Sequence, residues 1–83
     1  MKYRIISYDC ATDLMSETVS IPAKHLRRVL AIARIVNPEE LGEFPLEEDQ
    51  ARDIAALIGF DADVARFHYH LEQVTPAHVG LPV

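Results

Sequence analysis

Three stretches of the chain show the apolar patterns of β-strands. Residues 2–9 are rich in β-branched and aromatic types, and the adjacent pair Ile5 and Ile6 is typical of a central strand covered on both faces. Residues 15–21 alternate apolar and polar side chains, which predicts a second strand that forms a hairpin with the first. Residues 64–72 alternate most regularly, so they predict a third strand.

The third predicted strand separates its apolar and polar side chains between two faces. Because successive side chains of a strand point to opposite sides, one set should reach the core and the other the solvent. The apolar set consists of Ala65, Phe67, Tyr69 and Leu71. The polar set consists of Arg66, His68, His70 and Glu72.

The first predicted helix begins at Pro22, since a missing N–H costs nothing at the first helical position. It is expected to end at Asn37-Pro38, because proline keeps the residue before it away from helical angles. Its apolar face is expected to comprise Leu26, Val29, Leu30, Ala33 and Val36.

The second predicted helix begins near Glu47 and ends at Gly59, which can adopt the left-handed closing conformation. Phe60 is then expected to pack back on the last turn. The apolar face of this helix is expected to comprise Ala51, Ile54, Ala55 and Ile58. Between the two helices, residues 37–46 are expected to form a loop or a short turn of helix.

These elements follow one another in the order β-β-α-α-β. An α+β fold with a three-stranded sheet and two helices packed on one face would bury the apolar stripe of each element once. The third strand could pair with either edge of the hairpin. We expect one domain over residues 1–74 and an extended, partly mobile C-terminal tail over residues 75–83.

The composition is that of a globular protein, with 49% hydrophobic and 25% charged residues in a chain of 83. The single cysteine, Cys10, excludes an intrachain disulfide, and a secreted domain of this size usually carries several. The chain start lacks the apolar stretch of a signal peptide, and no apolar run is long enough to span a bilayer. A cytoplasmic location is therefore expected.

The net charge of −5 is unevenly distributed. Residues 1–36 hold six bases and three acids, residues 37–63 hold one base and nine acids, and residues 64–83 balance. Such an acidic chain predicts no nucleic-acid partner, because phosphate contacts need a basic face. No membrane partner is expected either, since no apolar run could span a bilayer. Two alternatives remain: the two halves neutralise each other, or the acidic segment faces a basic partner.

The two strand histidines suggest a metal site. His68 and His70 should point to the same side of the third strand, where two imidazoles could share a metal ion. A zinc site needs three or four ligands, so His25, His78 or Cys10 would have to join them. The alternative is a solvated sheet face, and no cofactor is expected.

The same face could instead bind a protein partner through Arg66, His68 and His70. If that partner were a second copy of the chain, protonation near pH ~6.5 would add charge at the interface and make the dimer sensitive to pH. Cys10 beside a histidine could act as a nucleophile, but no local signature supports this role, and no enzymatic activity is expected.

A second surface for a partner is the acidic segment 39–53. Its candidate contact residues are Glu39, Glu40, Glu43, Glu48 and Asp49. Acids in a loop and a first helical turn are also stable when merely solvated, because the helix dipole favours them and Glu48 can pair with Arg52.

Residues 44–72 also resemble the C-terminal half of a group of small bacterial proteins of unknown function. The resemblance is carried by the stretches FPLEEDQA (44–51), IGFDAD (58–63) and FHYHLE (67–72). His68 and His70 depart from that pattern, so it implies no role for them. Some small acidic bacterial proteins of this type are similar to immunity proteins of toxin systems.

The leading prediction is a non-enzymatic protein–protein interaction module, with self-association as a homodimer through the exposed sheet face or an edge strand. The first alternative is an immunity-like inhibitor that blocks a basic toxin through acidic segment 39–53. The second alternative is a metal-binding site that uses His68 and His70.

Overall fold

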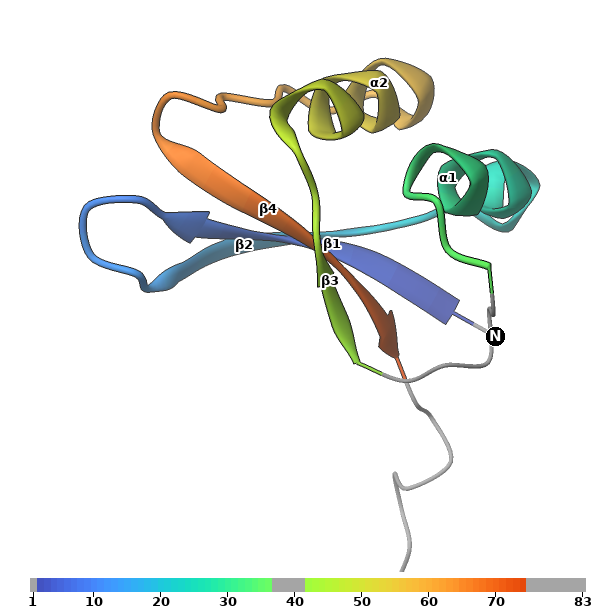
Figure 1. Cartoon of the computed structure of the whole chain (residues 1–83), viewed down its shortest axis with the longest axis horizontal. Coiled ribbons are helices and arrows are strands. Elements are labelled where there is room, and N and C mark those ends of the chain that lie inside the picture. The colour runs from blue at the N-terminus through green and yellow to red at the C-terminus, as the bar shows by residue number, and fades with distance from the viewer. Residues whose placement is uncertain (1, 37–41, 75–83) are drawn as a thin grey trace, which may run out of the picture.

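The computed structural model describes residues 2–36 and 42–74. Its elements are β1 (Lys2–Asp9), β2 (Met15–Ser20), a 3₁₀ turn (Ala23–His25), α1 (Leu26–Ile32), β3 (Glu43–Pro45), α2 (Glu48–Ile58) and β4 (Phe67–Val74). The strands form one antiparallel sheet in the order β2-β1-β4-β3, and both helices lie over the same face of it (Figure 1). The protein is therefore α+β as predicted, but within the described residues the sheet has four strands and not three.

The additional strand is β3, where the sequence predicts a loop or helical turn. Its three residues pair with β4, and Phe44 lies opposite Leu71. A segment this short cannot display a period of two, and Pro45 lacks the N–H that a central strand needs. The predicted loop is wrong for residues 43–45. β3 can include Pro45 because it lies at the edge of the sheet, where proline is tolerated.

The hydrophobic core lies between the sheet and the helices. β1 and β4 occupy the centre of the sheet, and their register places Ile5 opposite Leu71, both fully buried. The third strand thus pairs with β1, which settles the alternative that the pattern leaves open. The buried core cluster comprises Tyr3, Ile5, Ile21, Val29, Ala51, Ile54, Tyr69 and Leu71. Burial of each large apolar side chain contributes about 1.5–3 kcal/mol.

Helix α1 is shorter than predicted, since it ends at Ile32 and not at Asn37-Pro38. Arg34 adopts the left-handed conformation with φ 61°, and the next amide donates a hydrogen bond of 3.0 Å to the Leu30 carbonyl. This arrangement closes the helix without glycine, so the sequence gives no signal for it. Val36, predicted to lie on the apolar face, is 94% exposed.

Helix α2 follows the prediction closely. It begins after Glu47, and Gly59 closes it in the left-handed conformation with φ 88°. The Phe60 N–H donates to the Ala55 carbonyl at 3.1 Å, and the Phe60 ring packs toward β4, with its centroid 5.9 Å from that of Tyr69. Packing of this ring on the last turn of α2 stays a prediction. The buried apolar residues of the helix are Ala51, Ile54 and Ala55.

Strand β4 begins at Phe67, three residues later than predicted. The Phe67 N–H donates to the Asp63 carbonyl at 2.9 Å, which makes residues 64–66 a turn. Ala65 and Arg66 therefore do not belong to the strand, and Ala65 is exposed instead of facing the core. The tail expected over residues 75–83 lies outside the described residues. In the part of the chain that the structure describes, no helix is long and apolar enough to cross a membrane.

The side chain of Gln50 joins the two helices. Its carbonyl oxygen accepts a hydrogen bond of 2.8 Å from the Glu47 N–H, and its amide donates one of 3.0 Å to the Ile32 carbonyl. The first bond stabilises the start of α2, and the second satisfies a carbonyl at the end of α1. Gln50 is only 8% exposed, so if its side chain were removed, water could not readily reach the backbone groups that it now hydrogen-bonds.

We expect Gln50→Ala to lower the free energy of unfolding by about 1–3 kcal/mol, because it removes both bonds from a buried site. Urea denaturation followed by circular dichroism measures the loss. Glu48→Ala, an exposed change in the same helical turn, is the matched control and should cost less than about 0.5 kcal/mol. Equal losses for the two variants would contradict the role of Gln50.

Candidate functional site

The face of the sheet opposite the helices carries a cluster of mostly polar side chains, which we call the open face. Cross-strand pairs place Tyr8 opposite His68 and Arg4 opposite Glu72. Because side chains alternate along each strand, these residues share one side of the sheet. The open face comprises Arg4, Ile6, Tyr8, Glu43, His68, His70 and Glu72.

Glu43 is the centre of the contacts on this face. The Tyr8 hydroxyl donates a hydrogen bond of 2.8 Å to Glu43 Oε2, and His70 Nδ1 lies 3.2 Å from the same oxygen. The His70 contact lacks hydrogen-bond geometry, although its Nδ1 is buried. The rings of Tyr8 and His70 meet edge to face with centroids 4.9 Å apart. One carboxylate on β3 is therefore linked to β1 across β4.

The electrostatics of the cluster favour a protonated tyrosine. The hydrogen bond to Glu43 raises the pKa of Tyr8 above its ordinary value of 10.0, and desolvation and the negative charges of Glu43 and Glu72 act in the same direction. Arg4 opposes them, but its Nε donates to Glu72 Oε1 at 2.7 Å. At neutral pH, Tyr8 is a hydrogen-bond donor and not a base.

The open face also contains an apolar residue that is hidden from water. Ile6 is 2% exposed, although within the described residues no helix covers this side of the sheet. Its neighbours in the register are Thr18 on β2 and His70 on β4. The prediction that residues 2–9 form a central strand is confirmed. Helices cover only one of its faces, and neighbouring side chains cover the other.

The two candidate metal ligands lie on the same face, as predicted. His68 is exposed and His70 is half-buried. Among residues 2–36 and 42–74, no group of three or more His, Cys, Asp or Glu side chains is placed to hold a metal ion. Of the further ligands considered, Cys10 is exposed in the turn after β1, and His78 lies outside the described residues. A metal site on this face stays a prediction.

Arg66 is not part of the strand that carries the two histidines. It lies in the turn before β4, and its guanidinium carbon is 5.0 Å from the centre of the Phe67 ring. The predicted strand is wrong at Arg66, because β4 begins after it, and a partner-binding surface of Arg66, His68 and His70 stays a prediction.

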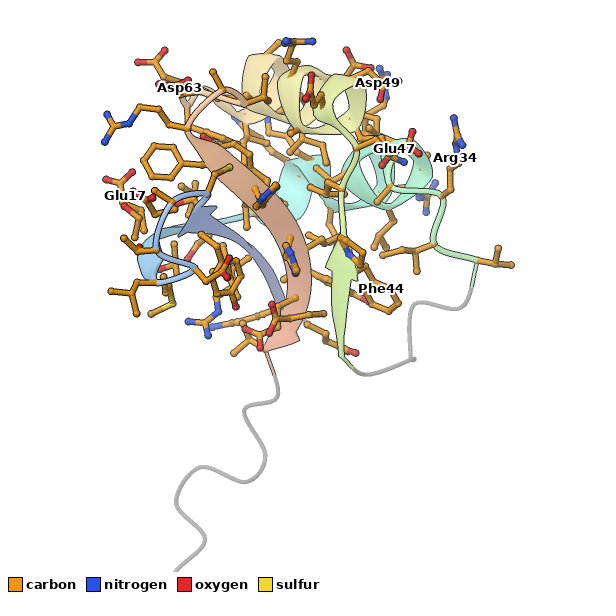
Figure 2. The ribbon with its side chains drawn as sticks, turned by 60° about the vertical axis from the view of Figure 1, so that its left-hand side comes forward. Glu17, Arg34, Phe44, Glu47, Asp49 and Asp63 are labelled. Atoms are coloured by element: carbon orange, nitrogen blue, oxygen red, sulfur yellow. The ribbon has the colours of Figure 1, made fainter. Side chains whose placement is uncertain are left out.

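The predicted acidic contact residues are divided between two places. Glu43 belongs to the open face, whereas Glu48 and Asp49 are exposed at the start of α2 (Figure 2 labels Asp49). Glu39 and Glu40 lie outside the described residues. Glu48 lies 3.8 Å from Arg52, the helix pair expected from the sequence, but both side chains are largely exposed and such pairs contribute little.

Among the described residues, the acids of α2 form no ion pairs with the bases of α1, although Arg28 and Asp53 line the same pocket between the helices. No ion pair between the two helices occurs in the part of the chain that the structure describes. Of the two alternatives for the uneven charge, neutralisation between these helices is therefore not seen. Figure 2 shows Glu47 and Asp49 projecting from the beginning of α2.

The second surface of interest is the free edge of β2. The sequence predicts that an edge strand could bind a partner, but it does not say which strand lies at the edge. The Ile21 N–H donates to the Tyr3 carbonyl at 3.1 Å, and the register continues with alternate residues. In an antiparallel ladder the residues between hydrogen-bonded pairs point their backbone groups away from the neighbouring strand. The backbone N–H and C=O groups of Thr18 and Ser20 therefore face outward.

The two edges of the sheet differ in how far they are protected against pairing. β3 is three residues long and contains Pro45, both of which prevent pairing with another strand. β2 has six residues without lysine or proline, and its one charged residue is Glu17. A bulge disturbs only its first part, where Ser7 Oγ accepts a hydrogen bond of 3.1 Å from the Glu17 N–H.

A scan against protein-family models and searches of curated proteins and of solved structures find no match to this chain. Its function is therefore inferred from its own residues and their geometry.

We expect Glu43→Gln to lower the pKa of Tyr8 toward its ordinary value, because a neutral amide no longer disfavours the phenolate. Since the raised pKa belongs to the folded state, the stabilisation is present below the ordinary pKa and is lost as the pH rises through the folded one. Ultraviolet titration of tyrosinate measures the shift.

Tyr8→Phe is the control for this titration, because it identifies which ionisation step belongs to Tyr8 and leaves Tyr3 and Tyr69 in place. If the Tyr8 step lies at the same pH in the wild type and in Glu43→Gln, the bond to Glu43 does not influence the hydroxyl.

Proposed function

We propose that this protein is a non-enzymatic protein-binding module that forms a homodimer by pairing β2 with β2 of a second copy. The observation that supports this proposal is the outward-facing backbone of Thr18 and Ser20 on a six-residue edge strand. Unpaired N–H and C=O groups in a row are a template for another strand. A two-fold antiparallel pairing would satisfy both copies with the same contacts.

The open face is a weaker candidate for the interface. Ile6 is already covered, Tyr8 is hydrogen-bonded to Glu43, and Arg4 is paired with Glu72. If a partner covered the Arg4–Glu72 ion pair, both charges would lose their water. Because the two groups are already paired with each other, the partner would add no new contact to offset this cost. Pairing at the β2 edge buries no charge. There the backbone groups exchange hydrogen bonds to water for hydrogen bonds to the second strand.

We expect the wild-type protein to sediment with twice the 9.3 kDa mass of one chain, in a concentration-dependent manner. Thr18→Pro should yield a monomer with an unchanged circular dichroism spectrum, because it removes an outward N–H that β1 does not use. Thr18→Val keeps that N–H and is the matched control, so it should remain dimeric.

A wild-type chain that stays monomeric up to about 1 mM would overturn the proposed dimer. A dimer that persists in Thr18→Pro would show that β2 is not the interface.

A second candidate function is recognition of a basic protein, in the manner of an immunity-like inhibitor, by the acidic start of α2. The observation that favours it is the exposure of Glu48 and Asp49, which within the described chain form no ion pair with α1, although Glu48 lies 3.8 Å from Arg52 of its own helix. Exposed acids on one side of a protein attract a basic partner and accelerate its association.

For this candidate we expect a partner captured from the native host by the wild-type chain to be lost with Glu48→Lys/Asp49→Lys. Asp61→Lys/Asp63→Lys is the control, since both acids are exposed beyond the other end of α2 and the change in charge is the same. Mass spectrometry quantifies the captured protein. Equal capture by the two double variants would contradict recognition by the start of α2.

A further inference from the structure

We infer that Leu14 and Met15 of each copy insert into an apolar groove at the far end of β2 on the second copy. Each strand would then carry an anchor at one end and a receiving groove at the other. This inference rests on the proposed β2 dimer and names the side chains that give it specificity.

The anchor residues are large, apolar and exposed where β2 begins. Leu14 is 68% exposed and Met15 is 58% exposed. Adjacent apolar side chains left in water are expected at an interaction site more than elsewhere on a small protein.

The hairpin turn holds the anchor in place through backbone contacts. The Asp9 N–H donates to the Leu14 carbonyl at 2.9 Å, and the Leu14 N–H donates to Thr12 Oγ1 at 3.2 Å. The Asp13 N–H donates in turn to the Asp9 carbonyl at 2.7 Å. A pre-formed turn loses less conformational entropy when its side chains dock.

The groove lies at the opposite end of the same strand and has a volume of about 470 Å³. Its apolar lining comprises Tyr3, Ile21, Ala23, Leu26 and Val74, and Lys2 and Arg4 lie at its border. Thr18 and Ser20 also line it, and these are the residues whose backbone faces the free edge. A strand that pairs with this edge therefore runs beside the groove.

A two-fold pairing centred on Thr18 brings the anchor and the groove together. The two Thr18 backbones then exchange hydrogen bonds, and Ser20 of each copy lies opposite Ser16 of the other. Counting residues outward, Met15 comes level with Ile21 of the second copy, and Leu14 comes level with its Pro22. The bulge at Ser16 turns the Met15 side chain to the face of Thr18 and Ser20, which also line the groove. The end of β2 that exposes apolar side chains thus meets the end that offers an apolar groove.

Charge supports this register over its neighbour. With Thr18 at the centre, Glu17 of one copy lies opposite Val19 of the other. A pairing centred on Glu17 would place two carboxylates directly opposite each other, which is destabilising, and would use backbone groups that already face β1.

The test measures the dimer dissociation constant by sedimentation equilibrium. Leu14→Ser/Met15→Ser is expected to raise it about 10-fold or more, because both anchors lose their apolar contact. Val36→Ser is the matched control: it changes an apolar residue that is 94% exposed and distant in sequence from β2, and it should leave the constant unchanged. Equal constants for the anchor and control variants would overturn the inference.

The register is tested separately by cysteine cross-linking in a Cys10→Ser background. A mixture of Leu14→Cys and Pro22→Cys chains should form a disulfide-linked heterodimer on mild oxidation, since the pairing places these positions opposite each other. Within one chain the two positions lie at opposite ends of β2, too far apart for a disulfide.

These outcomes separate the two proposals. A monomeric wild type removes both the dimer and the anchor. If Thr18→Pro abolishes the dimer, the β2 interface is supported. If in that case the Leu14→Ser/Met15→Ser variant dimerises normally and no heterodimer cross-link forms, the anchor is wrong although the interface is right.

Discussion

Both helices pack on one face of a single sheet, and this one-sided core constrains the rest of the molecule. Ile5 on β1 and Leu71 on β4 are fully buried because α1 and α2 lie over them. In the described chain no second layer protects the reverse side of the sheet. Its side chains must therefore shield Ile6 and satisfy one another without help from another element.

The polar cluster on the open face meets that requirement. Glu43 accepts the Tyr8 hydrogen bond across β4, so it attaches a three-residue edge strand to the centre of the sheet. Arg4 and Glu72 add a second link between β1 and β4. These polar groups already contact one another, whereas the outer backbone groups of Thr18 and Ser20 on β2 have no neighbouring strand in the described chain.

The sequence predicts the elements whose patterns are long or carry a local signal. Three strands and α2 with its closing Gly59 are confirmed, and His68 and His70 face away from the core as expected. β3 is too short to show a period, and Arg34 closes α1 where glycine is usual. The Tyr8–Glu43 contact joins residues 35 positions apart, so it follows only from the strand order.

The strand order also determines when the protein can fold during its synthesis. β4 is the last strand of the described sequence, yet it occupies an inner position, with Lys2 opposite Val74. β4 therefore emerges from the ribosome after the N-terminal hairpin and both helices, and the closure of so long a loop is slow. Until then, the inward-facing edge of β1 and the apolar sides of the helices are open to cellular chaperones.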